Sequence, residues 1–179
     1  MSTPLISSLK LFTKTLMQEH TDQMIKSISS KKCVQVSSTF KQKYGLQNRN
    51  IPIELEMCYD PNHMQTILTL NNIQPIKMPP NVIDVPKAKL LWEQQDILKS
   101  LQKANPECLI TTKNFRCSVT GIIDVDPNNP MFKTTVHEKF NDMLDTLYNR
   151  SYNLYEYDHS YKRWDIDIFN GTYKKVRSN

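Results

Sequence analysis

The sequence predicts one α+β domain with three amphipathic helices and mostly antiparallel strands in local hairpins. Segment 115–125 alternates apolar and polar residues, which is the period of two expected for a half-buried strand. Between Phe132 and Leu147, apolar residues recur every three or four positions, as on one face of a helix. Breaker clusters such as 126–130 separate these segments. Helices and hairpins that succeed one another in this way are typical of the α+β class.

The chain has 179 residues, a net charge of +5 and a pI near 8.9. This length favours one domain with a sizeable core, and this charge mildly favours anionic partners. Lys10 and Lys14 interrupt the first apolar positions, so we predict no signal peptide, and no apolar run reaches transmembrane length. We therefore expect a cytoplasmic protein. The scarcity of Gly and Ala suggests an AT-rich genome, such as that of a virus or a parasite. For a viral source, the host cytoplasm or the virion is expected.

The N-terminal segment from Pro4 to about Ser29 is predicted to be a long helix capped by Thr3. Its apolar stripe consists of Leu5, Leu9, Phe12, Leu16, Met24 and Ile28. The stripe suits packing on the domain core, self-association or contact with a partner, and the polar stretch 18–23 argues against a membrane-surface helix. We accordingly divide the chain into an N-terminal helix, residues 1–30, and an α+β domain, residues 31–179, and predict self-association through the helix.

After a linker at 29–32, the sequence predicts several short strands. Residues 33–36 form a short strand, and 41–50 form a basic loop that turns at Gly45. Segments 53–59 and 64–70 form a hairpin across the turn 60–63. These predictions place two of the strands next to each other in the sheet.

The middle of the chain contains a connection, a helix and a second hairpin. The Pro-rich segment 71–85 has no periodicity and is predicted to be an extended connection. A helix begins near Asp84 and ends at Asn105–Pro106. Strand 107–112 then pairs with the strand 115–125 through a turn at Lys113–Asn114.

The C-terminal region is rich in aromatic residues, with six of the eight tyrosines from Tyr148 onwards. Residues 164–169 alternate as in a strand, and Asn170–Gly171 is a type I′ turn signal, so 172–177 is the predicted return strand. A two-residue turn places Asp167 opposite Lys174 and Asp165 opposite Val176.

Cations and rings alternate in this hairpin and define the candidate binding face. Its predicted nucleic-acid or anion-binding residues are Lys162, Arg163, Trp164, Tyr173, Lys175 and Arg177. Rings of this kind stack on bases while the cations contact phosphates. The same residue types also suit a protein interface or partial burial against a helix.

Two Asp-x-Asp pairs, Asp124/Asp126 and Asp165/Asp167, resemble the carboxylate spacing of metal-dependent phosphoryl-transfer sites. No phosphate-binding glycine loop accompanies either pair, so we predict no cofactor and no metal. The alternative hypothesis is a metal-dependent enzyme that processes nucleic acid through Asp165 and Asp167.

The four cysteines, Cys33, Cys58, Cys108 and Cys117, are widely spaced and are predicted to be reduced and buried. Zinc is rejected because the Cys and His residues lack paired ligand spacing. A nucleophilic pair of Cys108 or Cys117 with His137 remains open.

These observations together predict a non-enzymatic binding or assembly protein, such as a small viral structural or accessory protein. Its expected partner is nucleic acid, an acidic membrane surface or another protein.

Overall fold

The computed structural model describes residues 4–44, 47–75, 92–111, 114–150, 159–161, 164–167 and 172–175. Within these ranges the helices are α1 (Pro4–Ser27), α2 (Trp92–Ala104) and α3 (Phe132–Arg150). The strands are β1 (Cys33–Tyr44), β2 (Gln47–Asp60), β3 (Gln65–Pro75), β4 (Cys108–Ile110), β5 (Asn114–Ile123), β6 (His159–Tyr161), β7 (Trp164–Asp167) and β8 (Thr172–Lys175).

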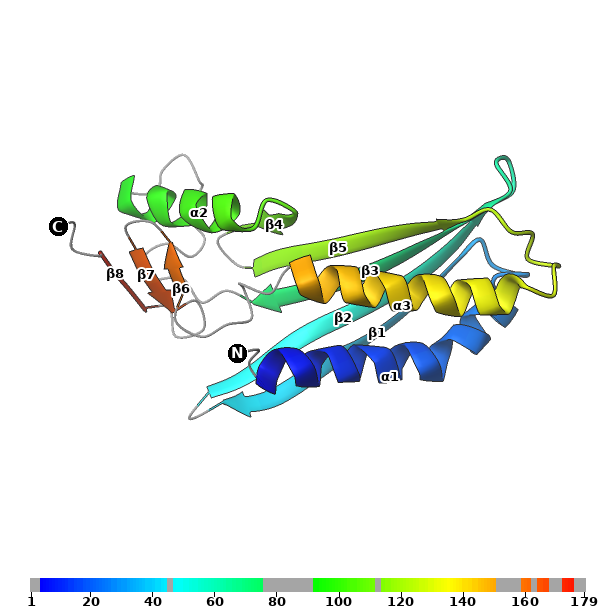
Figure 1. Ribbon diagram of the computed structural model, residues 1–179, viewed down its shortest axis with the longest axis horizontal. Helices are drawn as coiled ribbons and strands as arrows, with labels where there is room; N and C mark the ends of the chain where they lie inside the picture. The colour runs from blue at the N-terminus through cyan, green and yellow to red at the C-terminus, as the bar shows by residue number, and fades with distance from the viewer. Residues whose placement is uncertain are drawn as a thin grey trace.

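The strands form two antiparallel sheets. The larger sheet has the order β1-β2-β3-β5-β4, and the smaller has the order β6-β7-β8. Helices α1 and α3 lie side by side across one face of the larger sheet, and α2 lies with the smaller sheet near one end (Figure 1). The predicted α+β class, with antiparallel strands and three helices in the described ranges, is confirmed.

The core lies between the larger sheet and helices α1 and α3. Residues of β2 alternate between this core and the opposite face, so Ile51, Ile53, Leu55 and Met57 are completely buried. From the helices, the buried apolar residues that cover them include Leu9, Leu16, Met24, Phe132, Val136, Phe140, Met143 and Leu147. The helical and strand periodicities in the sequence therefore converge on one hydrophobic layer.

The predicted apolar stripe of helix α1 packs against the core of the same chain. Leu9, Leu16, Met24 and Ile28 are buried, and the ring of Phe12 meets that of Phe40 edge to face at 5.4 Å. Of the roles predicted for this stripe, packing on the domain core is the one observed. Self-association remains a prediction, but the buried stripe no longer supplies the surface for it.

Several strand boundaries differ from the predictions. The predicted strand 33–36 is only the start of the 12-residue β1, and the predicted loop 41–50 belongs mostly to a long β1–β2 hairpin. These strands form despite their polar side chains, because backbone pairing stabilises them and the polar residues can face solvent on the open side of the sheet. Strand β3 likewise extends to Pro75, into the predicted connection 71–85. The rest of that connection and the predicted helix start at Asp84 lie outside the described residues.

A buried polar network joins α1, β3 and α3 inside the apolar layer. The hydroxyl of Thr13 donates to the carbonyl of Leu9, so the Tyr148 hydroxyl, 2.6 Å away, donates to Thr13 Oγ1. Asn72 Nδ2 in turn donates to the Tyr148 oxygen at 3.2 Å. Burial raises the pKa of Tyr148 to about 12, which keeps this hydroxyl neutral. The tyrosine thus serves as the central partner of two buried polar groups.

Replacing Tyr148 by phenylalanine is expected to lower the free energy of unfolding by about 1–3 kcal/mol, because Asn72 would lose its acceptor in a fully buried position. Urea denaturation of the two proteins measures the difference. Tyr59→Phe, at a half-buried position in β2, is the matched control and should cost less. Equal losses in the two variants would contradict a special role for the network.

Candidate binding surfaces

The structure places half of the predicted anion-binding residues on two paired strands. Trp164 lies in β7, and Tyr173 and Lys175 lie in β8. Trp164 is directly opposite Lys175, and Ile166 is opposite Tyr173. Positions directly opposite in an antiparallel pair lie on the same side of the sheet. Lys162, Arg163 and Arg177 lie outside the described residues, so the structure brings together three of the six predicted positions at the level of strand register.

The register of this hairpin differs from the prediction by two residues. Asp167 is opposite Thr172, and Asp165 is opposite Lys174, whereas a two-residue turn would pair Asp167 with Lys174. The strands end earlier than the Asn170–Gly171 signal implies, and residues 168–171 lie outside the described ranges. A shift of two preserves the side of the sheet on which each residue lies, because side chains alternate with a period of two. Trp164 and Lys175 are therefore still expected on the same side of the sheet, as predicted.

The aspartate pairs have different local partners. Asp124 accepts a hydrogen bond from Gln65 Nε2 at 2.9 Å, and Asp126 accepts one from the backbone amide of Asn128 at 2.9 Å. The second contact is a local turn of the kind that Asp commonly stabilises. Within the described ranges, no group of three or more His, Cys, Asp or Glu residues is positioned to hold a metal ion.

All four cysteines are paired, so the prediction of reduced thiols is wrong. The predicted burial holds for Cys108 and Cys117 but not for Cys33, which is exposed. Cys33 is bonded to Cys58, joining β1 to β2, and Cys108 is bonded to Cys117, joining β4 to β5. Each pair occupies directly opposite positions in its hairpin. The sequence contained this signal: a hairpin centred next to Gly45, the predicted turn, puts Cys33 opposite Cys58.

The disulfides also remove the hypothetical cysteine nucleophile. A sulfur in a disulfide is not a thiolate, so neither Cys108 nor Cys117 can pair with His137 as a nucleophile in this state. His137 instead contacts Asp22 of α1 through Nε2 at 2.9 Å, and Lys133 lies 3.2 Å from the same carboxylate. These contacts hold the pKa of Asp22 below its ordinary value, first through the hydrogen bond with His137. The cluster links α1 to α3 at the surface.

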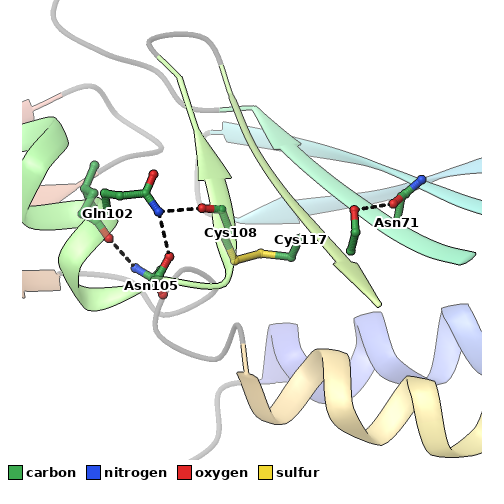
Figure 2. The surroundings of a disulfide bond; sticks show 7 residues. Asn71, Gln102, Asn105, Cys108 and Cys117 are labelled. Carbon is green, nitrogen blue, oxygen red and sulfur yellow. Dashed lines mark hydrogen bonds between the residues drawn. A yellow bond between two sulfur atoms is a disulfide. The ribbon is translucent and has the colours of Figure 1, made fainter. Parts of the chain in front are cut away.

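The second disulfide lies within a small network at the junction of α2, β4 and β5 (Figure 2). Gln102 Nε2 donates to the carbonyls of Cys108 at 2.7 Å and Asn105 at 3.2 Å. Asn105 Nδ2 donates to the carbonyl of Leu101 at 3.1 Å, at the end of α2. The side chain of Gln102 thus ties the end of α2 to the start of β4, and the disulfide ties β4 to β5.

The face of the larger sheet opposite α1 and α3 carries polar side chains in rows across the strands. Ser118 Oγ donates to Asn71 Oδ1 at 2.5 Å, and Asn71 Nδ2 donates to Glu54 Oε2 at 3.3 Å, linking β5, β3 and β2. The residues of this open face include Gln35, Ser37, Thr39, Glu54, Glu56, Thr69, Asn71, Arg116, Ser118 and Thr120. The sequence patterns did not predict this surface, because the predicted strands 33–36 and 64–70 cover only part of β1 and β3.

A groove of about 450 Å³ runs between α3 and β5. Its lining consists of Val119, Thr120, Gly121, Ile122, Lys139, Asp142, Met143 and Thr146. Gly121 allows this close approach, because a Cβ at that position would lie 2.8 Å from Lys139 Cγ and from Met143 Sδ. The groove is therefore bordered by backbone on one side and by a mixed polar helix face on the other.

Among the helices that the structure describes, none is both long enough and apolar enough to span a lipid bilayer. Comparisons with protein-family models, with curated proteins and with solved structures found no match to this chain.

Proposed function

We propose that this protein is a non-enzymatic binding and assembly protein whose C-terminal strands contact an anionic partner. The observation that carries the proposal is the β7–β8 register, which sets Trp164 opposite Lys175 and Ile166 opposite Tyr173. A cation beside flat rings suits a phosphate backbone with accessible bases. The net charge of +5 adds a general attraction for polyanions.

Single-stranded nucleic acid is the partner that this arrangement favours, because aromatic stacking needs unpaired bases. An acidic membrane surface would use the cations but would gain less from the rings. The open face of the larger sheet suits an anionic partner less well, since Glu54 and Glu56 lie near its centre. The C-terminal strands are therefore the better location for such contacts.

The proposal predicts that Lys175→Glu combined with Arg177→Glu weakens binding of a single-stranded oligonucleotide at least tenfold at low salt. Each contact with a phosphate that is lost also reduces the slope of log affinity against log salt by about 0.7. Fluorescence anisotropy with a labelled oligonucleotide at several salt concentrations measures both quantities.

Lys31→Glu combined with Lys32→Glu is the matched control, because it makes the same change in net charge on an exposed loop between α1 and β1. This control should retain most of the affinity. If both double variants weaken binding equally, only the overall charge matters and the proposed face is wrong. If acidic vesicles but not oligonucleotides distinguish the variants, the anionic partner is a membrane.

The alternative, a metal-dependent enzyme that uses Asp165 and Asp167, also remains a hypothesis. Asp165 lies opposite Lys174 in the strand register, and a lysine at such a position would compete with a metal ion for the carboxylate. Ordered Mn²⁺ bound between the two aspartates in a soaked crystal would favour the enzyme.

The viral source and the cytoplasmic location also remain proposals. Disulfides persist mainly in oxidising surroundings, which include virion surfaces, and are rare in the cytosol. The two disulfides therefore support a virion location more strongly than a free cytoplasmic one. Thiol counting on protein isolated from its natural setting, with free thiols blocked during lysis, distinguishes the two.

A further inference from the structure

The outer edge of β5 is paired over only part of its length. Strand β4 covers β5 from Phe115 to Cys117, whereas β5 continues to Ile123 (Figure 1). In the part of the chain that the structure describes, no strand pairs with this outer edge beyond Cys117. The stretch from Thr120 to Ile123 is thus the end of the larger sheet on that side.

The spacing of the disulfide shows which backbone groups point outward. The Cα atoms of Cys108 and Cys117 are 4.5 Å apart, which is the spacing of a pair that does not exchange hydrogen bonds. The N–H and C=O groups of Cys117 therefore point away from β4, towards β3. Since these directions alternate along a strand, Thr120 and Ile122 point their backbone groups towards the outer edge.

The chemistry of this edge favours addition of another strand. Segment 119–123 contains no charged residue and no proline. Four of its five residues are β-branched, a type favoured in strands, and two of these, Thr120 and Ile122, are exposed. Ile122 is 49% exposed, and Thr120 is exposed beside it. Proteins usually protect sheet edges with charged residues, prolines or bulges, and this segment contains neither a charged residue nor a proline.

The groove beside the edge provides room for the side chains of an added strand. Its floor is the backbone around Gly121, and its other wall is the face of α3 that carries Lys139, Asp142 and Thr146. A strand added to β5 would alternate its side chains between this groove and the open face. The edge and the groove therefore form one continuous surface.

We propose that the occupant is a second copy of this chain, whose own β5 edge pairs antiparallel with this one about a twofold axis near Gly121. The flanking charges support this choice. Arg116 precedes the uncharged segment and Asp124 follows it, and both are exposed. Antiparallel pairing brings Arg116 of one copy towards Asp124 of the other, whereas parallel pairing would bring like charges together. The two larger sheets would then form one continuous sheet.

This interface differs from the C-terminal strands proposed to contact anions, so either proposal can fail without the other. Roughly five residues at about 3.4 Å each form the shared edge, which is short for a stable protein interface. A weak, concentration-dependent dimer is therefore expected. It replaces the first helix, whose apolar stripe is buried, as the location of self-association.

Sedimentation velocity of the full disulfide-bonded chain, from low micromolar to near-millimolar concentration, tests the proposal. Thr120→Lys places a charge on the edge and should raise the dissociation constant of the dimer at least tenfold. The matched control is Thr69→Lys, because Thr69 lies directly opposite Thr120 on the same open face but in the interior strand β3. Thr69→Lys should dimerise as the parent does, and Ile122→Lys should repeat the effect of Thr120→Lys.

Hydrogen exchange at the Thr120 and Ile122 amides provides the second readout. These amides should exchange quickly in the monomer and slowly at concentrations where the dimer forms. A chain that stays monomeric throughout, or a dimer that Thr120→Lys leaves unchanged, overturns the proposal. Amides already protected in the monomer also overturn it, since another segment of the same chain would then cover the edge.

Discussion

Removal of the Cys33–Cys58 disulfide, by replacing both cysteines with alanine, is expected to lower the free energy of unfolding by about 3 kcal/mol. The bond spans 25 residues, and without it the unfolded chain gains the conformational freedom of that loop. The bond lies on the open face of the sheet, with Cys33 exposed, so the alanines create little cavity. Urea denaturation without reductant measures the loss.

The remaining disulfide supplies the control. Reductant should destabilise the parent more than the variant, because the parent has two bonds to lose and the variant has only Cys108–Cys117. Four titratable thiols in native protein purified without reductant would contradict the pairing itself. Unchanged stability in the variant would show instead that the unfolded chain is already restricted in this region.

Replacing Leu9 by alanine is expected to cost about 2–5 kcal/mol, the usual range for removing a fully buried leucine side chain from a core. Leu11 offers a close control, since it lies in the same helix but is 65% exposed, and Leu11→Ala should change stability by less than about 0.5 kcal/mol. Thermal and urea denaturation of both variants provide the comparison. Similar small effects in both would mean that α1 does not dock on the sheet in solution.

Elements with a strong local period were predictable from the sequence. The alternation through Cys117, Val119 and Gly121 identified β5, and the repeats around Phe140 identified α3, because burial on one face imposes these periods directly. The turn at 60–63 also correctly joined β2 to β3. These elements determine the α+β class, which explains why the class could be predicted when several details could not.

The missed details depend on backbone pairing between strands, which the side-chain pattern of one segment does not reveal. In β1, Ser37, Ser38 and Thr39 give no apolar signal, yet the strand continues because β2 supplies its backbone partners. The register of β7 and β8 was misplaced by two residues for a similar reason, since a turn motif alone does not fix where the strands stop. Of the candidate site, the sequence thus predicted the residue types and their side of the sheet, but not their exact partners.

The first disulfide closes the β1–β2 hairpin at the end opposite its turn. A pulling force applied to the two ends of the chain consequently passes through the sulfur atoms and bypasses the strands between them. Such a force therefore does not separate β1 from β2, and the oxidised chain cannot extend to its full contour length. At roughly 3.4 Å per extended residue, the enclosed residues withhold about 85 Å of extension. Reduction of this bond would make that length available once the paired strands separate, so the redox state of the surroundings limits how far the molecule can stretch under load.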